Sequence, residues 1–137
     1  MVQILDASVA VKWFVEEEDS KKAQEILSQV LTHPEDFAVP ELFLFEIANV
    51  LYILSKGDTD LYKDLFDTLC SLPIARYPIT AEFHSEIIIF QKLGLTAYDA
   101  SYAALALLCK GTWLTADKKA VSLLLSKESY NDLVVQF

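Results

Sequence analysis

The chain has 137 residues, of which 53% are hydrophobic and 23% charged, a composition typical of a folded domain and not of a disordered segment. Its 20 acidic residues outnumber its 11 basic ones, and the formal net charge of −9 repels nucleic acid at long range. Any role on nucleic acid therefore requires a bound cation that reverses the sign of the charge locally. A cationic partner protein is a natural expectation, and we predict a single domain over residues 1–137.

The cysteines and the longest apolar stretch indicate the compartment. Cys70 and Cys109 lack metal-ligand spacing and lie in apolar surroundings, which predicts free, buried thiols in a reducing cytosol. The N-terminus has no basic region followed by a long apolar stretch, so no signal peptide is expected. The longest apolar stretch, residues 42–54, contains Glu46 and falls short of the ~20 residues that span a bilayer. We expect a cytoplasmic protein without membrane contact.

The first quarter of the chain predicts a strand and two helices. Residues 2–5 form a short apolar run with β-branched side chains, which indicates a buried strand. Residues 7–15 read as a helix. The acidic run 16–19 suits the start of a second helix, extending to about Leu31, because negative charge is favoured at a helix N-terminus. Residues 37–39 then predict a second strand.

Two helices are predicted between the second strand and the third. Pro40 occupies a helix-start position, and residues 41–55 have the length and apolar density of a buried helix. The next helix, capped by Asp58 or Thr59, extends to about Ser71.

The rest of the chain continues to alternate strands with helices. Residues 74–77 lie between two prolines and predict a third strand near a sheet edge, because proline cannot complete a central ladder. The remaining predicted elements are helices from Thr80 to Leu93 and from Thr96 to about Lys110, a strand at 112–115, a helix at 117–125 and a strand at 133–135. Every strand is short and apolar. This pattern predicts a three-layer α/β/α sandwich with a short-stranded, mainly parallel central sheet.

Two aspartates follow predicted strands. In open α/β sheets, ligands bind beyond the carboxyl ends of the strands. Asp6 follows the first strand, and Asp117 lies two residues after the fourth. Ser8 beside Asp6, and Thr115 at the end of the fourth strand, would add hydroxyl groups. The alternative is that each aspartate merely caps the helix that follows it.

Two further carboxylates stand in apolar helical segments. Burying an unpaired carboxylate costs several kcal/mol, so Glu46 needs a partner, a metal ion or a proton. Asp99 stands at the start of a helix rich in small residues. The alternatives are an ion pair between Glu46 and Lys12, and a capping box in which Asp99 reaches back to the backbone of Thr96.

Convergence of these four carboxylates would make chemical sense. Two carboxylates ~4 Å apart repel by about 4 kcal/mol at an effective dielectric of 20. A hard divalent cation such as Mg²⁺ or Mn²⁺ removes that cost and prefers oxygen ligands. Such an ion polarises a phosphoryl oxygen and lowers the pKa of water. Spacing alone leaves open whether the four side chains meet.

Four segments of the chain resemble the PIN-domain ribonucleases, especially the toxins of VapBC-type toxin–antitoxin pairs. The segments are ILDASVAVKWF at 4–14, PEL through EIANVL at 40–51, GLTAYDASYAALA at 94–106 and LTADKK at 114–119. They occur in the order typical of the family and span nearly the whole chain.

The resemblance implies a Mg²⁺- or Mn²⁺-dependent endoribonuclease that hydrolyses RNA to leave a 5′-phosphate and a 3′-hydroxyl. By motif position, the acidic metal-binding set would be Asp6, Glu46, Asp99 and Asp117, with supporting hydroxyls from Ser8 and Thr115. The resemblance also implies a homodimer held inactive by a cognate antitoxin, which reaches the active site with a basic side chain. The chain departs from some relatives at Lys118 and Lys119, where they carry another carboxylate.

The remaining candidates divide between the site and the core. Lys12, Lys118 and Lys119 either contact RNA phosphates or are solvated surface lysines. Trp113 and Phe45, like the other large aromatic side chains near the motifs, are predicted to be core or dimer contacts, because basic residues are not interleaved with them.

Two rival functions share the predicted fold. One is another Mg²⁺-dependent phosphoryl-transfer domain, but an aspartyl-phosphate phosphatase would need a second aspartate at Ser8, and a receiver domain would need a lysine just after the last strand. The other is a non-catalytic protein-binding module. Binding of Mg²⁺ discriminates it from a nuclease, because a binding module has no need of the ion.

Overall fold

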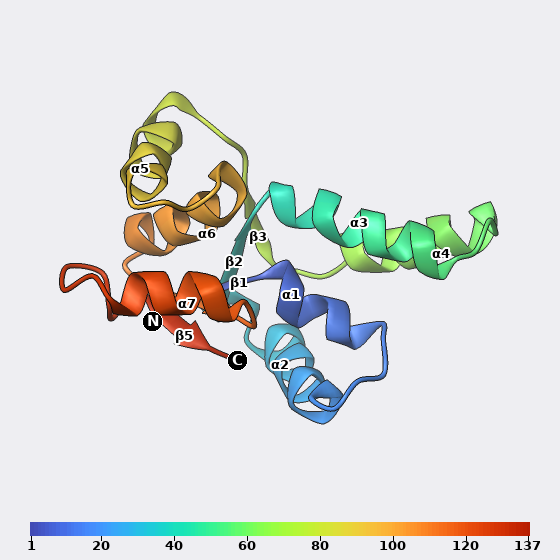
Figure 1. The fold of residues 1–137 in the computed structure, drawn as a ribbon. Coiled ribbons are helices and arrows are strands. Elements are labelled where there is room, and N and C mark those ends of the chain that lie inside the picture. Colours follow the sequence, from blue (N-terminus) through green and yellow to red (C-terminus); the bar gives the residue numbers. More distant parts are fainter.

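A computed structural model describes all residues, 1–137, and has a parallel five-stranded sheet at its centre with helices on both faces (Figure 1). The strands are β1 (Gln3–Leu5), β2 (Phe37–Pro40), β3 (Ala75–Tyr77), β4 (Thr112–Thr115) and β5 (Val134–Gln136). Their order in the sheet is β3-β2-β1-β4-β5, and every pair is parallel. The predicted α/β/α fold is confirmed.

Seven α-helices connect and cover the strands. They are α1 (Ala7–Ala10), α2 (Ser20–Thr32), α3 (Leu42–Leu54), α4 (Thr59–Cys70), α5 (Ala81–Lys92), α6 (Ala97–Leu108) and α7 (Lys118–Leu125). The chain steps from β1 outward to β3 and then crosses back to β4 and β5. Because such crossovers are right-handed, α1 to α4 lie on one face and α5 to α7 on the other, as Figure 1 shows.

Both α6 and β4 pack closely against β1, the middle strand of the sheet. Ala100, Ala103 and Ala104 on α6 are fully buried, and their small side chains let this helix approach β1, β2 and β4. Gly111, just before β4, passes so close to β1 that an added Cβ would lie 2.0 Å from the carbonyl oxygen of Val2. Only glycine fits there, so this position keeps β4 beside β1.

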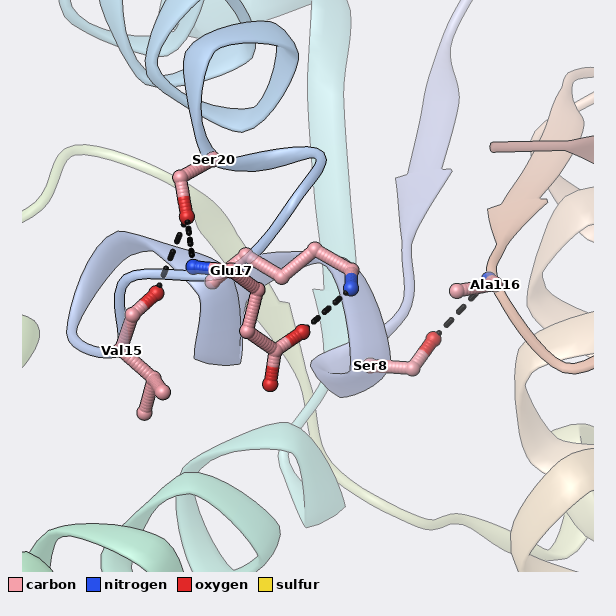
Figure 2. A network of polar contacts seen from close by, with 6 residues as sticks. Ser8, Val15, Glu17, Ser20 and Ala116 are labelled. Carbon is pink, nitrogen blue, oxygen red and sulfur yellow. Dashed lines mark hydrogen bonds and ion pairs between the residues drawn. The ribbon is translucent and has the colours of Figure 1, made fainter.

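The predicted helix at 7–15 is shorter than expected, and the acidic run 16–19 precedes α2, with Asp19 as the N-cap, instead of forming its first turn. α1 ends at Ala10 and a 3₁₀ turn, Val11–Trp13, follows, while α2 begins only at Ser20. Hydrogen bonds between residues of this loop and α2 cause both differences. The indole of Trp13 donates to the carbonyl of Ala23 on α2 (2.9 Å), and the Ser20 hydroxyl accepts from the Glu17 amide (2.6 Å) and donates to the Val15 carbonyl (3.1 Å). These bonds fold the acidic run into a loop, as Figure 2 shows for the Ser20 contacts.

The remaining predictions of local structure differ in smaller ways. Pro40 ends β2 and does not begin a helix, and the Glu41 amide after it continues the ladder by donating to the Tyr77 carbonyl (3.0 Å). β3 is an edge strand, as predicted. Cys70 and Cys109 are free but only half-buried, which corrects the expectation of buried thiols. No helix combines the length and the apolar character needed to cross a lipid bilayer.

Candidate active site

Asp6 stands at the carboxyl end of β1, where the chain leaves the sheet between β1 and β4. This is the point at which the strand order reverses, with β2 on one side of β1 and β4 on the other. The Asp6 side chain is 7% exposed, and its Oδ2 accepts from the Ser8 amide (2.8 Å) and so caps α1. Its Oδ1 accepts from the indole nitrogen of Trp113 (2.9 Å). Burial raises the pKa of Asp6 despite these hydrogen bonds, and the charge of Asp117 raises it further.

Glu46 lies in the middle of α3 and is half-buried. Its Oε1 accepts a hydrogen bond from the Tyr102 hydroxyl (2.7 Å), so the predicted alternative of an ion pair with Lys12 is wrong. Lys12 instead pairs with Glu17, with 2.7 Å between Nζ and Oε2. Burial raises the pKa of Glu46, as do the charges of Asp6 and Asp99, while the Tyr102 hydrogen bond lowers it.

Asp99 lies in the first turn of α6 and has the clearest electrostatic signature. Its backbone amide donates to Thr96 Oγ1 (3.2 Å), which is one half of the capping box considered as an alternative. The returning bond from the Asp99 carboxylate is not formed, and that carboxylate accepts no hydrogen bond in the structure. Burial raises the pKa of Asp99 to about 6, and the charges of Asp117 and Asp6 add to the effect.

Asp117 follows β4 and caps α7. Its Oδ1 accepts from the amides of Lys119 (2.9 Å) and Ala120 (3.3 Å), so the capping alternative is correct for Asp117 as it is for Asp6. Its own amide donates to the Thr115 hydroxyl (3.0 Å). Each carboxylate oxygen has two acceptor positions, so capping leaves both aspartates able to take a further ligand.

The hydroxyls of Ser8 and Thr115 join the two loops that carry Asp6 and Asp117. Ser8 Oγ accepts from the Ala116 amide (3.0 Å), a bond that Figure 2 shows spanning the gap between the two segments. The two hydroxyl oxygens are 3.4 Å apart, and Thr115 is fully buried. These hydroxyls therefore set the separation of the two aspartates and are occupied by protein groups.

Two aromatic residues hold carboxylates of the site, and neither was predicted to do so. Tyr102 on α6 and Trp113 on β4 stack with ring centroids 5.9 Å apart and planes 9° from parallel. Tyr102 donates to Glu46 and Trp113 donates to Asp6. Burial and the neighbouring carboxylates raise the pKa of Tyr102 well above its usual 10, so its hydroxyl stays a neutral donor.

The sequence holds one general signal for these aromatic contacts. A buried tyrosine hydroxyl or indole N–H needs a hydrogen-bond partner, and both residues stand in otherwise apolar segments. That partner is 56 residues away for Tyr102 and 107 for Trp113, so no local pattern identifies it. Of the predicted core aromatics, Trp113 is indeed fully buried, whereas Phe45 is 70% exposed.

The four carboxylates share one electrostatic environment without forming a closed cluster. Three of them have raised pKa values, each partly through the charge of one or two of the others. No three acidic, histidine or cysteine side chains lie close enough together to hold an ion as they stand. Asp6 and Asp117 are turned toward the helices that they cap, and repulsion between like charges opposes a closer approach of the four carboxylates. The donor set, oxygen throughout and collectively negative, fits a hard divalent cation by its chemistry.

Comparisons with known proteins agree with this architecture. The family model described as PIN domain matches residues 4–123, a range that contains all four carboxylates. The chain is 27% identical over 126 residues to Ribonuclease VapC3 of Pyrobaculum aerophilum, covering 87% of this chain and 92% of that protein.

Solved structures show the same fold. FitAcB from Neisseria gonorrhoeae superposes with a TM-score of 0.74 at 16% identity, covering 99% of this chain and 97% of that one. VapBC2 from Rickettsia felis, bound to a DNA fragment from their promoter, gives 0.69 at 14% identity, covering 100% and 99%. The resemblance predicted from the four sequence segments is thereby confirmed, and the chain belongs to the PIN-domain family.

Proposed function

We propose that this protein is a Mg²⁺- or Mn²⁺-dependent endoribonuclease and the toxin component of a toxin–antitoxin pair. The observation that carries the proposal is electrostatic. Carboxylates from four segments far apart in sequence interact electrostatically, and three of them have pKa values raised partly by the charges of the others. Such an arrangement is costly unless a cation offsets it. Membership of the PIN-domain family and similarity to a relative named as a ribonuclease support the same function.

Each carboxylate has a place in this proposal. Asp6, Asp99 and Asp117 would hold the divalent ion, directly or through water, because each retains free acceptor positions after its hydrogen bonds are counted. When bound, the ion would polarise a phosphoryl oxygen and lower the pKa of an attacking water. Glu46 would either join the ligands or orient that water. Its raised pKa brings it closer to the range in which a carboxylate accepts protons effectively.

Basic residues near the site would bind the RNA chain. Lys12 is four residues after Ser8, and Lys118 and Lys119 begin the helix that Asp117 caps. An acidic protein needs such contacts, since phosphate neutralisation supplies most of the affinity for nucleic acid. RNA enters the proposal as the substrate because the relative VapC3 is named a ribonuclease.

An apolar groove suits the expected antitoxin. A cavity of about 340 Å³ is lined by Phe45 and Tyr98, which immediately precede Glu46 and Asp99 in the sequence. Exposed aromatic side chains in this groove, together with the acidic residues of the proposed site, match a partner segment with apolar residues and one basic side chain. One similar structure is described as a toxin–antitoxin complex and another as VapBC2, which supports this partner.

A second copy of the chain is the other proposed partner. Phe45, Tyr52 and Ile53 on α3 are 70%, 65% and 73% exposed, and spacings of seven and eight residues place them on one face of the helix. Large exposed apolar patches mark interaction surfaces. Sedimentation equilibrium of the purified chain tests the homodimer, and a monomer at every concentration would contradict it.

Cleavage of RNA by the purified protein tests the enzymatic function. We expect cleavage in Mg²⁺ or Mn²⁺, loss of cleavage on chelation, and products with a 5′-phosphate. Asp6→Asn should lower the rate by at least about a hundredfold, since it removes the whole negative charge of one proposed ligand, while the melting temperature stays within a few degrees. Cleavage by Asp6→Asn at the rate of the unsubstituted protein would contradict the assignment.

One observation favours a non-catalytic protein-binding module as the second candidate. The acidic side chains do not form a closed cluster, and two of them act as helix caps. A binding module would cleave no RNA in either ion. It would also show no rise in melting temperature with millimolar Mg²⁺, because only a ligand that binds the folded state stabilises it.

A further inference from the structure

Tyr102 and Trp113 form one buried aromatic unit with a hydrogen bond at each end. Their side chains are 1% and 0% exposed, and their rings stack almost in parallel. The Tyr102 hydroxyl donates a hydrogen bond to Glu46 Oε1 (2.7 Å). The Trp113 indole nitrogen donates one to Asp6 Oδ1 (2.9 Å). A continuous path therefore joins a carboxylate on α3 to one at the end of β1 through side chains of α6 and β4.

We propose that Tyr102 and Trp113 are positioning residues that set the directions of the Glu46 and Asp6 carboxylates, and thereby the affinity of the site for a divalent cation. This inference rests on the proposed function. The pair would touch neither the ion nor the substrate. It would act through the two carboxylates, which we name the clamped carboxylates.

The physical reason is preorganisation. A free glutamate side chain samples several rotamers, and repulsion from Asp6 and Asp99 favours those that point away from the site. A donor fixed in the core restricts the carboxylate to orientations that keep the hydrogen bond. Each clamped oxygen retains a second acceptor position, so the bond orients the ligand without consuming it. Hydrogen bonds of this kind to metal ligands typically contribute 10- to 100-fold in metal affinity.

The stacking makes the two hydrogen bonds interdependent. Neither ring can leave its rotamer without opening a void against the other, because the interior is close-packed. Asp6 is further restrained by the Ser8 amide, whereas Glu46 accepts no other hydrogen bond. Tyr102 should therefore influence its carboxylate more than Trp113 influences Asp6.

The experiment is a calorimetric titration of the full chain with MgCl₂ or MnCl₂ alone, together with melting curves recorded without metal. The variants are Tyr102→Phe, which removes one oxygen, and Trp113→Phe, which removes the indole N–H. Trp13→Phe is the matched control because it deletes an indole hydrogen bond of the same length, 2.9 Å, to the Ala23 carbonyl. Tyr130→Phe is the second control, since Tyr130 packs on Phe90 and its hydroxyl has no hydrogen-bond partner in the protein.

We expect Tyr102→Phe to weaken metal binding at least tenfold and Trp113→Phe at least threefold, while both controls stay within twofold of the original affinity. The loss of metal affinity in the double variant should be smaller than the product of the two single-variant losses, because the two residues act as one unit. A purely structural role would lower the melting temperature and leave the metal affinity unchanged.

Unchanged or tighter metal binding by folded Tyr102→Phe overturns the inference, whatever Trp113→Phe does. Because Tyr102→Phe leaves the ring in place, it decides the question even if Trp113→Phe fails to fold. No binding of either ion by the unsubstituted protein would overturn the proposed function itself, and the positioning role with it. Binding by the unsubstituted protein together with an unaffected Tyr102→Phe overturns the positioning role alone.

Discussion

Asp99 is a single residue of the proposed site whose ionised carboxylate lowers the stability of the folded chain. Its carboxylate accepts no hydrogen bond, and burial with two like charges raises its pKa to about 6 from the ordinary 3.8. Below about pH 4 the residue is protonated in both the folded and the unfolded chain. Between pH 4 and 6 the folded chain binds a proton that the unfolded chain has lost, so the stability falls as the pH rises. Above pH 6 the full cost of the ionised carboxylate is present.

Asp99→Asn should therefore stabilise the protein in the absence of divalent metal at pH 7. We expect a gain of about 1 kcal/mol in the free energy of unfolding, or about 3 °C in melting temperature, after a discount for partial exposure to solvent. The gain should vanish below about pH 4, where the aspartate is already protonated. Thermal unfolding from pH 3.5 to 7.5 measures it.

Asp60→Asn is the matched control for that prediction. Asp60 also stands in the first turn of a helix but is exposed and lies outside the site. Its substitution should reduce stability slightly, by about 0.3–0.5 kcal/mol, through loss of the favourable interaction with the helix dipole. A loss of stability in Asp99→Asn as large as in Asp60→Asn would show that Asp99 serves only its helix.

The acidic residues of the candidate site stand out in the sequence, whereas their hydrogen-bond partners do not. Glu46 stands out because its neighbours along the helix are apolar, and Asp6 because it ends a strand. Tyr102 and Trp113 look like any aromatic core residue until the fold brings them to their acceptors. The alternative of a Lys12–Glu46 pair failed for the same reason, since only the folded loop places Glu17 beside Lys12.

At the scale of elements, the acidic loop 16–19 is where sequence and structure differ most. Four consecutive acidic residues suit a helix start by charge alone, yet bonds from Ser20 and Trp13 hold the segment outside α2. The loop has a consequence for the site, because Glu17 from it neutralises Lys12, whose side chain is only 13% exposed.

Glu17→Gln should release Lys12 and strengthen RNA binding. Because Glu17 is 44% exposed, its ion pair with Lys12 contributes only about 1 kcal/mol, so stability should change little and the affinity for RNA should rise about two- to fivefold. Fluorescence anisotropy with a labelled RNA, in Ca²⁺ to suppress cleavage, measures the change.

Glu18→Gln controls for net charge. It removes one negative charge from the same loop, but Glu18 takes part in no ion pair. An equal gain in the two variants would show that Lys12 has no special role and that the loop acts only through its overall charge.

The strands and most helices were predictable because their signals are local. The bounds predicted from the apolar segments agree with the structure to within a few residues. The predicted starts of three helices are confirmed, with Asp58 capping α4 and threonines capping α5 and α6. The order of the strands was not predicted. It depends on how α6 packs against β1, β2 and β4, and on the close approach at Gly111.

At the scale of the whole molecule, the net negative charge opposes the binding of RNA that the proposed function requires. A chain with a net charge of −9 repels RNA, and three of its four candidate carboxylates have pKa values raised partly by the charges of the others. In the proposed function a divalent ion would resolve both problems, because it would offset the repulsion among the carboxylates and attract phosphate. In the same proposal, the acidic site and the apolar groove with its exposed aromatic side chains would suit a basic inhibitory segment.

The most direct test of the central claim is an anomalous difference map from crystals grown with millimolar Mn²⁺. The account predicts a peak within about 2.0–2.6 Å of oxygens from at least two of Asp6, Glu46, Asp99 and Asp117, or bridged to them by water. A map without a peak at this edge of the sheet, or with manganese only elsewhere on the acidic surface, would contradict it.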